Sequence, residues 1–451
     1  MFKSINPYDQ SVVAEFELQS DAALEKKLAN AATAFKIWRR KSFAERGAAM
    51  RKIATILGDN KEKYARIITL EMGKTIVEAR AEVEKCAGAC DYYSQHAEEF
   101  LQEQHVLTEG KKSFVHYEPV GAVLAIMPWN FPLWQVFRFA APSIMAGNVG
   151  LLKHAPNVTQ TSLVIEEIFK EAGFPEGVFQ SLVIDVDKVE RIIRHDIVQA
   201  VTLTGSEYAG SHVAALAGKN IKKSVLELGG SDPFIVLPDA DFEMAAKIAT
   251  QSRMRNAGQS CIAAKRFIVV EKAKDEFLHL FRKNIEALQQ GNPMDEKTTL
   301  SPMARLDLAE KLEKQVKESI SRGAKPILNG TRNGCNYQPV LLDNVKAGMP
   351  AFDEETFGPL AAIITVSDEA EAISVANNSR YGLGSSIWTR DLEKAESMAK
   401  EIEAGAVFIN SLMRSDARLS FGGIKKSGYG RELSELGIKE FTNAKTIFIA
   451  Q

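Results

Sequence analysis

Hydrophobic residues divide the chain into a helical first part and a longer part in which strands and helices alternate. Over the first hundred residues, apolar side chains recur every three or four positions, as at Leu24, Leu28 and Phe35. This spacing predicts amphipathic helices with one face against a core. A third helix is predicted over about 61–102, with an interruption near Gly73.

From Pro119 onward, short apolar runs rich in β-branched residues alternate with helical stretches. A short apolar run bounded by turn residues is typical of a strand that is buried on both faces. The alternation predicts parallel sheets covered by helices, as in doubly wound α/β folds. The strand candidates are 123–126, 149–152, 200–203, 234–237, 266–270, 361–364 and 406–409.

A second series of strand and helix units begins near Gly229, which predicts two doubly wound α/β domains that meet there. A hairpin and an apolar last strand indicate an additional small β extension for oligomerisation, because an unpaired strand edge promotes aggregation. The last strand is expected to pair with the hairpin, either in its own chain or in another subunit. The predicted boundaries are 1–104 and 118–228 for the first domain, 229–422 for the second, and 105–117 and 437–451 for the extension.

Composition and charge narrow the class of protein. Among 451 residues the net charge is −2, which gives no electrostatic reason to expect nucleic acid or an anionic membrane as a partner. No apolar stretch approaches a membrane span, and the first residues lack the apolar core of a signal peptide. Four cysteines do not form a disulfide framework, and none has a partner at zinc-ligand spacing. We therefore expect a cytoplasmic protein without a metal.

Cys261 is the first candidate for chemistry. It follows a run of small and polar residues, 256–260, and precedes a β-rich segment. This pattern predicts a nucleophilic thiol on a tight loop, whereas an isolated cysteine is usually a small core residue. A nearby helix N-terminus or ordered amide is expected to favour its thiolate.

Two further side chains have the types that a covalent thiol enzyme requires. Glu227 is flanked by leucines and followed by two glycines, so partial burial is expected to raise its pKa and make it a base near neutrality. The alternative is a carboxylate that faces solvent or an arginine. Asn130 lies between two prolines and could donate to an oxyanion beside the Cys261 N–H, or be an ordinary turn asparagine.

A phosphate site is indicated without the usual glycine fingerprint. No Gly-x-Gly-x-x-Gly follows the first strand, but 201–206 is predicted to be a strand that runs into a turn at Gly205 and Ser206. A helix follows this turn. Free N–H groups at its start could hold a pyrophosphate.

Together these motifs resemble those of the NAD(P)-dependent aldehyde dehydrogenase superfamily, over essentially the whole chain. The separation between Glu227 and Cys261 also matches that family. The matching strings are Pro128-Trp129-Asn130-Phe131-Pro132, Thr204-Gly205-Ser206, Leu226-Glu227-Leu228-Gly229-Gly230, Gly258-Gln259-Ser260-Cys261, Glu355-Thr356-Phe357-Gly358-Pro359 and Phe421-Gly422-Gly423-Ile424-Lys425-Lys426-Ser427-Gly428.

The resemblance implies a role for each catalytic residue. Cys261 would attack the aldehyde to form a thiohemiacetal, and Asn130 with the Cys261 N–H would hold the oxyanion. Hydride transfer to the nicotinamide would leave a thioester. Glu227 would then activate the water that releases the acid. This role for Glu227 argues against a CoA-acylating relative, and the presence of all three residues argues against a purely structural protein.

The resemblance also implies a nicotinamide coenzyme. Lys153 would bind the adenine ribose, Glu355 the nicotinamide ribose, and Phe357 would flank the nicotinamide ring. Members selective for NAD often carry Glu three residues after the lysine, where this chain has Pro156, so NAD is expected with NADP not strongly excluded. The implied cofactor residues are Trp129, Lys153, Pro156, Gly205, Ser206, Gly229, Glu355 and Phe357.

Two arginines indicate an aldehyde that carries a carboxylate. Arg138 and Arg255 match arginines of succinate semialdehyde dehydrogenases, whose short bacterial branch the chain resembles most, and guanidinium groups bind carboxylates well. Trp134 and Ser415 are the other predicted substrate residues. The alternative is a broad aliphatic or aromatic aldehyde dehydrogenase, in which the arginines stabilise the fold through acidic partners. In either case a homodimer or homotetramer is expected.

Overall fold

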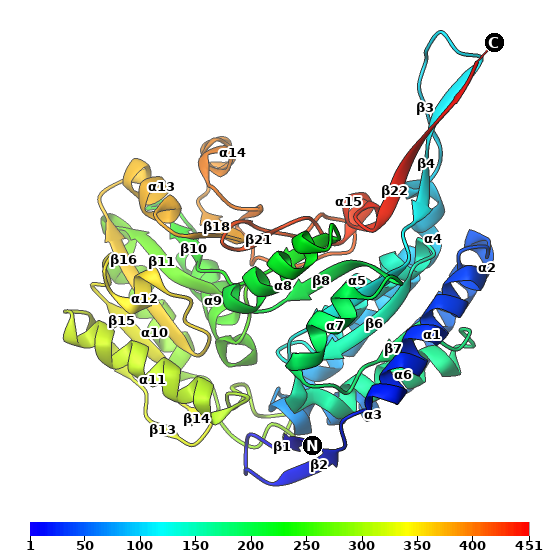
Figure 1. Ribbon diagram of the computed structural model, residues 1–451. Coiled ribbons are helices and arrows are strands. Elements are labelled where there is room, and N and C mark those ends of the chain that lie inside the picture. Colours follow the sequence, from blue (N-terminus) through cyan, green and yellow to red (C-terminus); the bar gives the residue numbers. More distant parts are fainter. Residues whose placement is uncertain (451) are drawn as a thin grey trace.

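The computed structural model describes residues 1–450, and Figure 1 shows two helix-covered sheets with a narrow β arm that projects from one of them. The first sheet is parallel except for one antiparallel edge strand at its start. In spatial order its strands are β21 (Gly428–Tyr429), β9 (Lys223–Glu227), β8 (Val198–Thr204), β5 (Ala122–Met127), β6 (Val149–His154) and β7 (Phe179–Ser181).

The second sheet has the same character, with one antiparallel strand at an edge. Its strands, in spatial order, are β12 (Lys325–Asn329), β15 (Val340–Asp343), β16 (Leu360–Val366), β11 (Ala264–Val270), β10 (Asp232–Val236), β18 (Gly384–Trp388) and β19 (Ala406–Ile409). The predicted fold class, two doubly wound α/β sheets, is confirmed. Strands β6, β10 and β11 are buried throughout and mostly apolar because helices cover both faces of each sheet.

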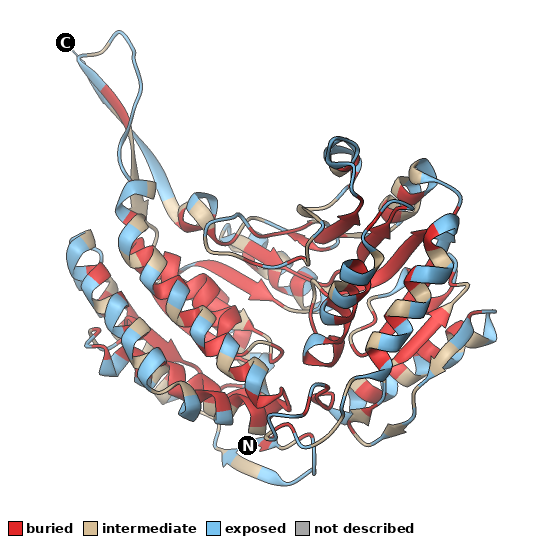
Figure 2. Ribbon diagram, turned by 180° about the vertical axis from the view of Figure 1, so that it is seen from behind, coloured by how far each residue is buried: buried red, intermediate tan, exposed pale blue. Residues whose placement is uncertain are grey.

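Helices pack on both sheets with their apolar faces inward, and Figure 2 shows the buried interior between half-exposed helices. The predicted third helix is two helices separated at Gly73, which is left-handed with φ 80° and ends the first of them. The helices before Gly229 are α1 (Asp21–Trp38), α2 (Phe43–Asp59), α3 (Lys61–Met72), α4 (Ile76–Phe100), α5 (Trp134–Met145), α6 (Thr159–Glu171), α7 (Val189–Arg194) and α8 (Glu207–Lys219). Those after it are α9 (Phe242–Met254), α10 (Lys274–Glu286), α11 (Leu306–Ser321), α12 (Pro350–Asp353), α13 (Glu369–Asn377), α14 (Leu392–Glu401) and α15 (Ser434–Lys439).

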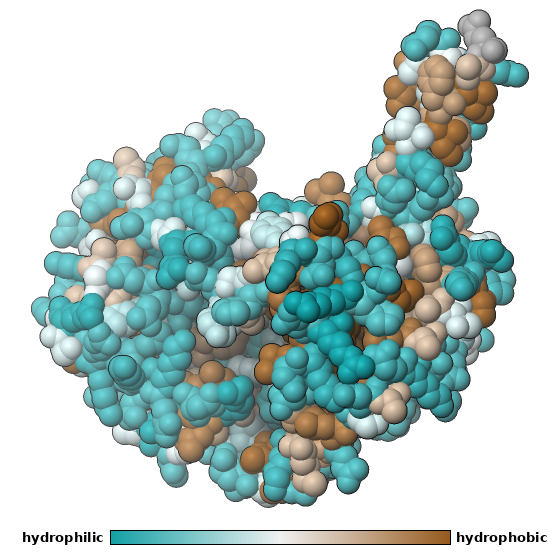
Figure 3. Space-filling model, in the orientation of Figure 1, coloured by the Kyte–Doolittle hydropathy of each residue, from teal (hydrophilic) through white to brown (hydrophobic). Residues whose placement is uncertain are grey.

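The arm is built from β3 (Gln104–His105), β4 (Lys112–Pro119) and β22 (Thr442–Ile449). Strand β22 pairs with β4 of its own chain over its full length, from Thr442 opposite Pro119 to Ile449 opposite Lys112. Of the two pairings considered for the last strand, the structure has the one within the chain. Figure 3 shows hydrophobic residues gathered on the arm, where Leu107, Phe448 and Ile449 are exposed.

The remaining strands form short pairs, and four 3₁₀ turns connect larger elements. None of the helices in residues 1–450 combines the length and apolar character that a bilayer crossing requires. The short elements are β1 (Phe2–Ile5) with β2 (Val12–Phe16), β13 (Arg332–Asn333) with β14 (Asn336–Tyr337), β17 (Tyr381–Gly382) with β20 (Ile424–Lys425), and η1 (Pro156–Val158), η2 (Val186–Lys188), η3 (Arg255–Gly258) and η4 (Glu271–Ala273).

The topology brings the predicted motifs to one edge. Strands β5, β6, β8 and β9 are parallel neighbours, so the loops that follow them leave the same side of the first sheet. These loops carry Asn130, Pro156, Ser206 and Gly229. The turn that carries Cys261 precedes β11 and approaches the same region from the second sheet.

Candidate active site

An unusual turn delivers Cys261 to the site. After α9 the chain passes through three consecutive left-handed residues, Asn256 (φ 52°), Ala257 (φ 50°) and Gly258 (φ 73°). A Cβ at Gly258 would lie 2.3 Å from the Gly358 carbonyl oxygen, so only glycine fits there. Small residues therefore precede Cys261 because the backbone is left-handed and closely packed, and such strained backbone is concentrated at functional sites.

Cys261 is partly exposed and lines a cavity of about 650 Å³. Burial raises the pKa of its thiol to about 12, although the positive charges of Arg138 and Lys265 act in the opposite direction. Desolvation of the sulfur thus outweighs the two cations and favours the neutral thiol.

Asn130 lies in the loop after β5 and is bound to the Cys261 turn. Its Nδ2 donates to the Gln259 carbonyl at 3.1 Å, and Asn256 Nδ2 donates to the Asn130 carbonyl at 2.9 Å. A side-chain amide has two N–H groups, so one remains for another acceptor. The predicted amide donor and the predicted nucleophile are thus fixed relative to each other.

Glu227, the last residue of β9, is buried rather than facing solvent. Within residues 1–450 no donor forms a hydrogen bond with either of its carboxylate oxygens. Burial raises its pKa to about 8, while Arg138 lowers this pKa and the charge of Glu432 raises it further. A carboxyl group with this pKa can act as a base near neutrality, and its charge in turn raises the pKa of Cys261.

Arg138 has an acidic partner within the described residues. Its guanidinium forms a buried ion pair with Glu432, and Nη2 donates to Thr204 Oγ1 at 3.1 Å. It also lies 4.5 Å from the Phe421 ring centroid. The structure thus gives Arg138 the acidic partner that the alternative of fold-stabilising arginines expects, because a charge buried this deeply requires a charged partner. Arg138 still contributes to the cavity wall.

Arg255 lies on the cavity wall with its side chain exposed, 5.9 Å from the Phe131 ring centroid. Trp134 and Ser415 lie on the same wall, where Trp134 Nε1 donates to Ser415 Oγ at 3.1 Å. The structure thus brings the other predicted substrate residues to the cavity of Cys261.

Sequence reasoning missed Lys85, which α4 directs into this cavity. Its Nζ donates to Ser415 Oγ at 2.7 Å and lies 4.0 Å from the Trp134 ring centroid. The sequence held no signal for Lys85, because helical spacing places it beside buried residues but does not predict which side chains it contacts. Together with Arg255 and Arg414 it gives the wall three cations that have no carboxylate within ion-pair distance among the described residues.

A second cavity, of about 980 Å³, contains three of the predicted cofactor residues: Ser206, Gly229 and Glu355. Ser206 caps α8, with its Oγ accepting from Ala209 N at 3.2 Å. A Cβ at Gly229 would lie 2.6 Å from Glu355 Oε2, so this glycine makes room for the carboxylate. A hydroxyl and a helix N-terminus suit phosphates and a carboxylate suits ribose hydroxyls, so these residues fit a dinucleotide.

The other predicted cofactor residues lie outside the walls of this cavity. Gly205 N donates to the Glu227 carbonyl at 3.0 Å. Lys153 is the second-last residue of β6, with its Nζ 3.4 Å from the His154 carbonyl, and burial lowers its pKa. Pro156 is exposed at the start of η1, and Trp129 meets Phe357 edge to face at 5.8 Å.

No cluster of three His, Cys, Asp or Glu residues that could hold a metal ion occurs in the part of the chain that the structure covers.

Comparison with known proteins places this geometry in a family. The model of the aldehyde dehydrogenase family matches residues 1–447. The chain is 49% identical over 450 residues to a probable succinate-semialdehyde dehydrogenase [NADP(+)] of Synechocystis, covering 99% of both chains. It is 46% identical over 448 residues to the succinate semialdehyde dehydrogenase [NAD(P)+] Sad of Escherichia coli, covering 99% of this chain and 97% of that one.

The solved structures agree. The crystal structure of succinic semialdehyde dehydrogenase from Streptococcus pyogenes in complex with NADP+ superposes with a TM-score of 0.98 at 40% identity, covering 100% of both chains. A family match over nearly the whole chain, relatives of this identity and the same fold lead to one conclusion. The chain belongs to the aldehyde dehydrogenase family.

Proposed function

We propose that the protein oxidises a short aldehyde that carries a carboxylate, such as succinate semialdehyde, to the dicarboxylic acid with a nicotinamide coenzyme. One observation carries the choice of substrate: Lys85, Arg255 and Arg414 line the Cys261 cavity without carboxylate partners of their own in residues 1–450. An anionic substrate would neutralise them, and charge-assisted hydrogen bonds to a carboxylate are strong. The names of the relatives support the same substrate.

The chemistry assigned to the chain uses three residues. The Cys261 sulfur, as thiolate, adds to the aldehyde carbon, and the oxyanion of the thiohemiacetal accepts from Asn130 Nδ2 and the Cys261 N–H. A bound nicotinamide coenzyme supplies the hydride acceptor. Cys261 is then left as a thioester. Glu227 takes a proton from water as the water oxygen attacks the thioester carbon, which releases the acid and returns the sulfur.

For the coenzyme, we propose that Ser206 and the start of α8 hold phosphate, with Trp129 beside it, and that Glu355 holds the nicotinamide ribose. Phe357 would flank the nicotinamide and Lys153 the adenine ribose. Pro156 supplies no carboxylate to repel a 2′-phosphate, and the relatives are named for NADP(+) or NAD(P)+. We therefore propose that the protein accepts NADP as well as NAD, and the relatives' names give no support to a preference for NAD.

We also propose that the protein is a homodimer or homotetramer. The arm exposes Leu107, Phe448 and Ile449, and exposed apolar groups on a projecting strand pair suit contact with another subunit.

For the domains, we propose the boundaries that the sequence predicted. Strand β21, which follows residue 422, belongs to the first sheet. Four free cysteines suit a reducing compartment such as the cytoplasm.

A broad-specificity aldehyde dehydrogenase is the second candidate, and one observation favours it. Arg138, expected to bind the substrate carboxylate, is paired with Glu432. Phe131, Trp134 and Phe421 also give the cavity apolar walls that would accept a neutral chain.

Kinetics with Arg255→Ala separate the two candidates. We expect kcat/KM for succinate semialdehyde to fall about 10- to 100-fold, the usual effect of losing a charged hydrogen-bond partner, with little change for hexanal. Arg282→Ala, an exposed arginine of α10 that pairs with Glu286, serves as the control. An equal effect of Arg255→Ala on both aldehydes would remove the argument for an acid site.

A further inference from the structure

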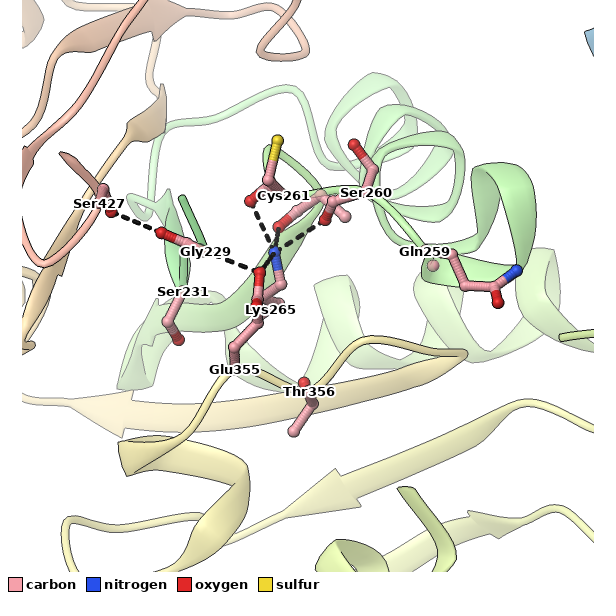
Figure 4. A network of polar contacts seen from close by, with 12 residues as sticks. Gly229, Ser231, Gln259, Ser260, Cys261, Lys265, Glu355, Thr356 and Ser427 are labelled. Atoms are coloured by element: carbon pink, nitrogen blue, oxygen red, sulfur yellow. Dashed lines mark hydrogen bonds and ion pairs between the residues drawn. The ribbon is translucent and has the colours of Figure 1, made fainter. Parts of the chain in front are cut away.

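A lysine with no role in the chemistry above lies directly behind the nucleophile. Lys265, the second residue of β11, has a fully buried side chain. Its Nζ donates to three carbonyl oxygens of the Cys261 turn: Ser260 at 2.9 Å, Cys261 at 2.7 Å and Ala263 at 3.2 Å. Figure 4 shows the carbonyl of Cys261 facing this amine while its sulfur points away.

The three contacts suit a charged lysine. Three acceptors use three N–H groups, and a neutral amine has only two. The groups that face it are Glu355 Oε1 at 3.8 Å from the loop before β16, Asp232 on β10, and the like charge of Arg253 on α9. Burial lowers the pKa of Lys265, whereas Glu355 and Asp232 raise it. Burial is the larger effect, and the two carboxylates offset part of the desolvation cost of a buried ammonium.

A purely structural role does not account for this charge. A hydroxyl, an amide or a water molecule could satisfy the same carbonyls without the desolvation cost of an ion. Lys265 and Arg138 are the two cations that act against burial at the Cys261 thiol, and Arg138 is neutralised by Glu432. Lys265 is therefore the cation whose position is fixed by the nucleophile's own turn.

We propose that Lys265 is a positioning residue for the reaction, whose ammonium fixes the Cys261 turn and stabilises negative charge on its sulfur. The inference depends on the proposed role of Cys261 as nucleophile. It also connects the two cavities, because Glu355, which accepts from Gly230 N at 3.0 Å on the coenzyme side, is the same carboxylate that balances Lys265.

The test measures ionisation of the thiol rather than turnover. The full-length protein is treated with iodoacetamide between about pH 6 and about pH 9, and modification of Cys261 is followed by peptide mass spectrometry, since the thiolate is the species that reacts. Lys265→Gln keeps amide donors but no charge, Lys265→Met keeps neither, and Lys265→Arg keeps the charge. We expect alkylation about tenfold slower in the first two variants, equivalent to one pKa unit, and near the wild-type rate in the third.

Alkylation of Lys265→Gln and Lys265→Met at the wild-type rate would overturn the proposal. Circular dichroism and thermal melting identify any variant that fails to fold, and Lys265→Arg then provides the test, because arginine keeps the charge. Alkylation of Cys261 in folded Lys265→Arg that is about tenfold slower than in the wild type would overturn the proposal equally. Because no aldehyde or coenzyme is added, this result is independent of the proposed substrate, which the kinetics of Arg255→Ala test.

Discussion

The Lys85 ammonium lies 2.7 Å from the Ser415 hydroxyl and 4.0 Å from the Trp134 ring centroid, on the wall of the cavity that ends at Cys261. Burial, together with the charges of Arg255 and Arg138, lowers the pKa of Lys85 to about 7. The amine is therefore charged below that pH and largely neutral above it. The positive charge that would attract an acidic aldehyde is itself dependent on pH.

We expect KM for succinate semialdehyde to rise about tenfold as pH increases from about 6 to about 8.5, since the ammonium that binds the carboxylate loses its proton over this range. Lys85→Met should have a high KM at both pH values, and Lys85→Arg a low KM at both. Steady-state kinetics measure these values, with hexanal as the control substrate. A pH-dependent KM that persists unchanged in Lys85→Met would contradict this role.

Glu227 should control the release of the acid. Its pKa of about 8 means that the carboxylate becomes the major form only above that pH, so kcat should rise with pH and level off beyond about pH 8. Glu227→Gln should lower kcat about 10²- to 10⁴-fold and abolish this rise.

Rapid mixing of Glu227→Gln with aldehyde and coenzyme should still give one burst of reduced coenzyme, because the thioester forms without the base. Glu435→Gln, an exposed carboxylate of α15, is the control. Steady-state turnover that survives intact in Glu227→Gln would mean that the thioester is not released by hydrolysis through this residue.

A buried ion pair should hold the Asn130 loop in place. Glu82 pairs with Lys74, and its Oε1 accepts from Leu133 N at 2.9 Å and Trp134 N at 3.0 Å, just after Asn130. Glu82→Leu or Lys74→Met alone should lower the free energy of unfolding by about 3–5 kcal/mol, because each leaves a buried charge unpaired.

The double variant Lys74→Met with Glu82→Leu should lose less than the sum of the single losses, as urea unfolding would measure. Lys61→Met, which removes a surface pair with Glu84, should cost about 1 kcal/mol or less. Losses of that small size for the buried single variants would show that the pair contributes little.

Coenzyme choice should respond to a carboxylate at position 156. Pro156 is exposed at the start of η1, three residues after the lysine proposed for the adenine ribose. Pro156→Glu should weaken NADP binding about 10- to 100-fold through repulsion of the 2′-phosphate, with NAD much less affected. Pro156→Gln separates loss of the proline ring from gain of charge, and coenzyme fluorescence titration gives both dissociation constants. Equal weakening of NAD and NADP binding would mean that the adenine ribose does not bind near position 156.

The periodicity of the chain predicted the two sheets well because strands buried on both faces consist mostly of apolar residues. The strand candidates near 123–126 and 234–237 correspond to β5 and β10 for this reason. The sequence did not identify the partner of the last strand, because its apolar residues indicate that it must pair but not with which strand. Only the structure shows that β22 pairs with β4 of its own chain.

For the candidate site, the sequence by itself determined the residue types and their order: a thiol after small residues, a carboxylate after a strand, an amide between prolines. These are local features, fixed by backbone conformation and by neighbours along the chain. The partners of charged groups were decided by the tertiary structure alone, because electrostatic energies depend on distance and burial, which residues far apart in sequence create together. Glu432 beside Arg138, Lys85 behind Ser415 and Glu355 beside Lys265 are all contacts of this kind.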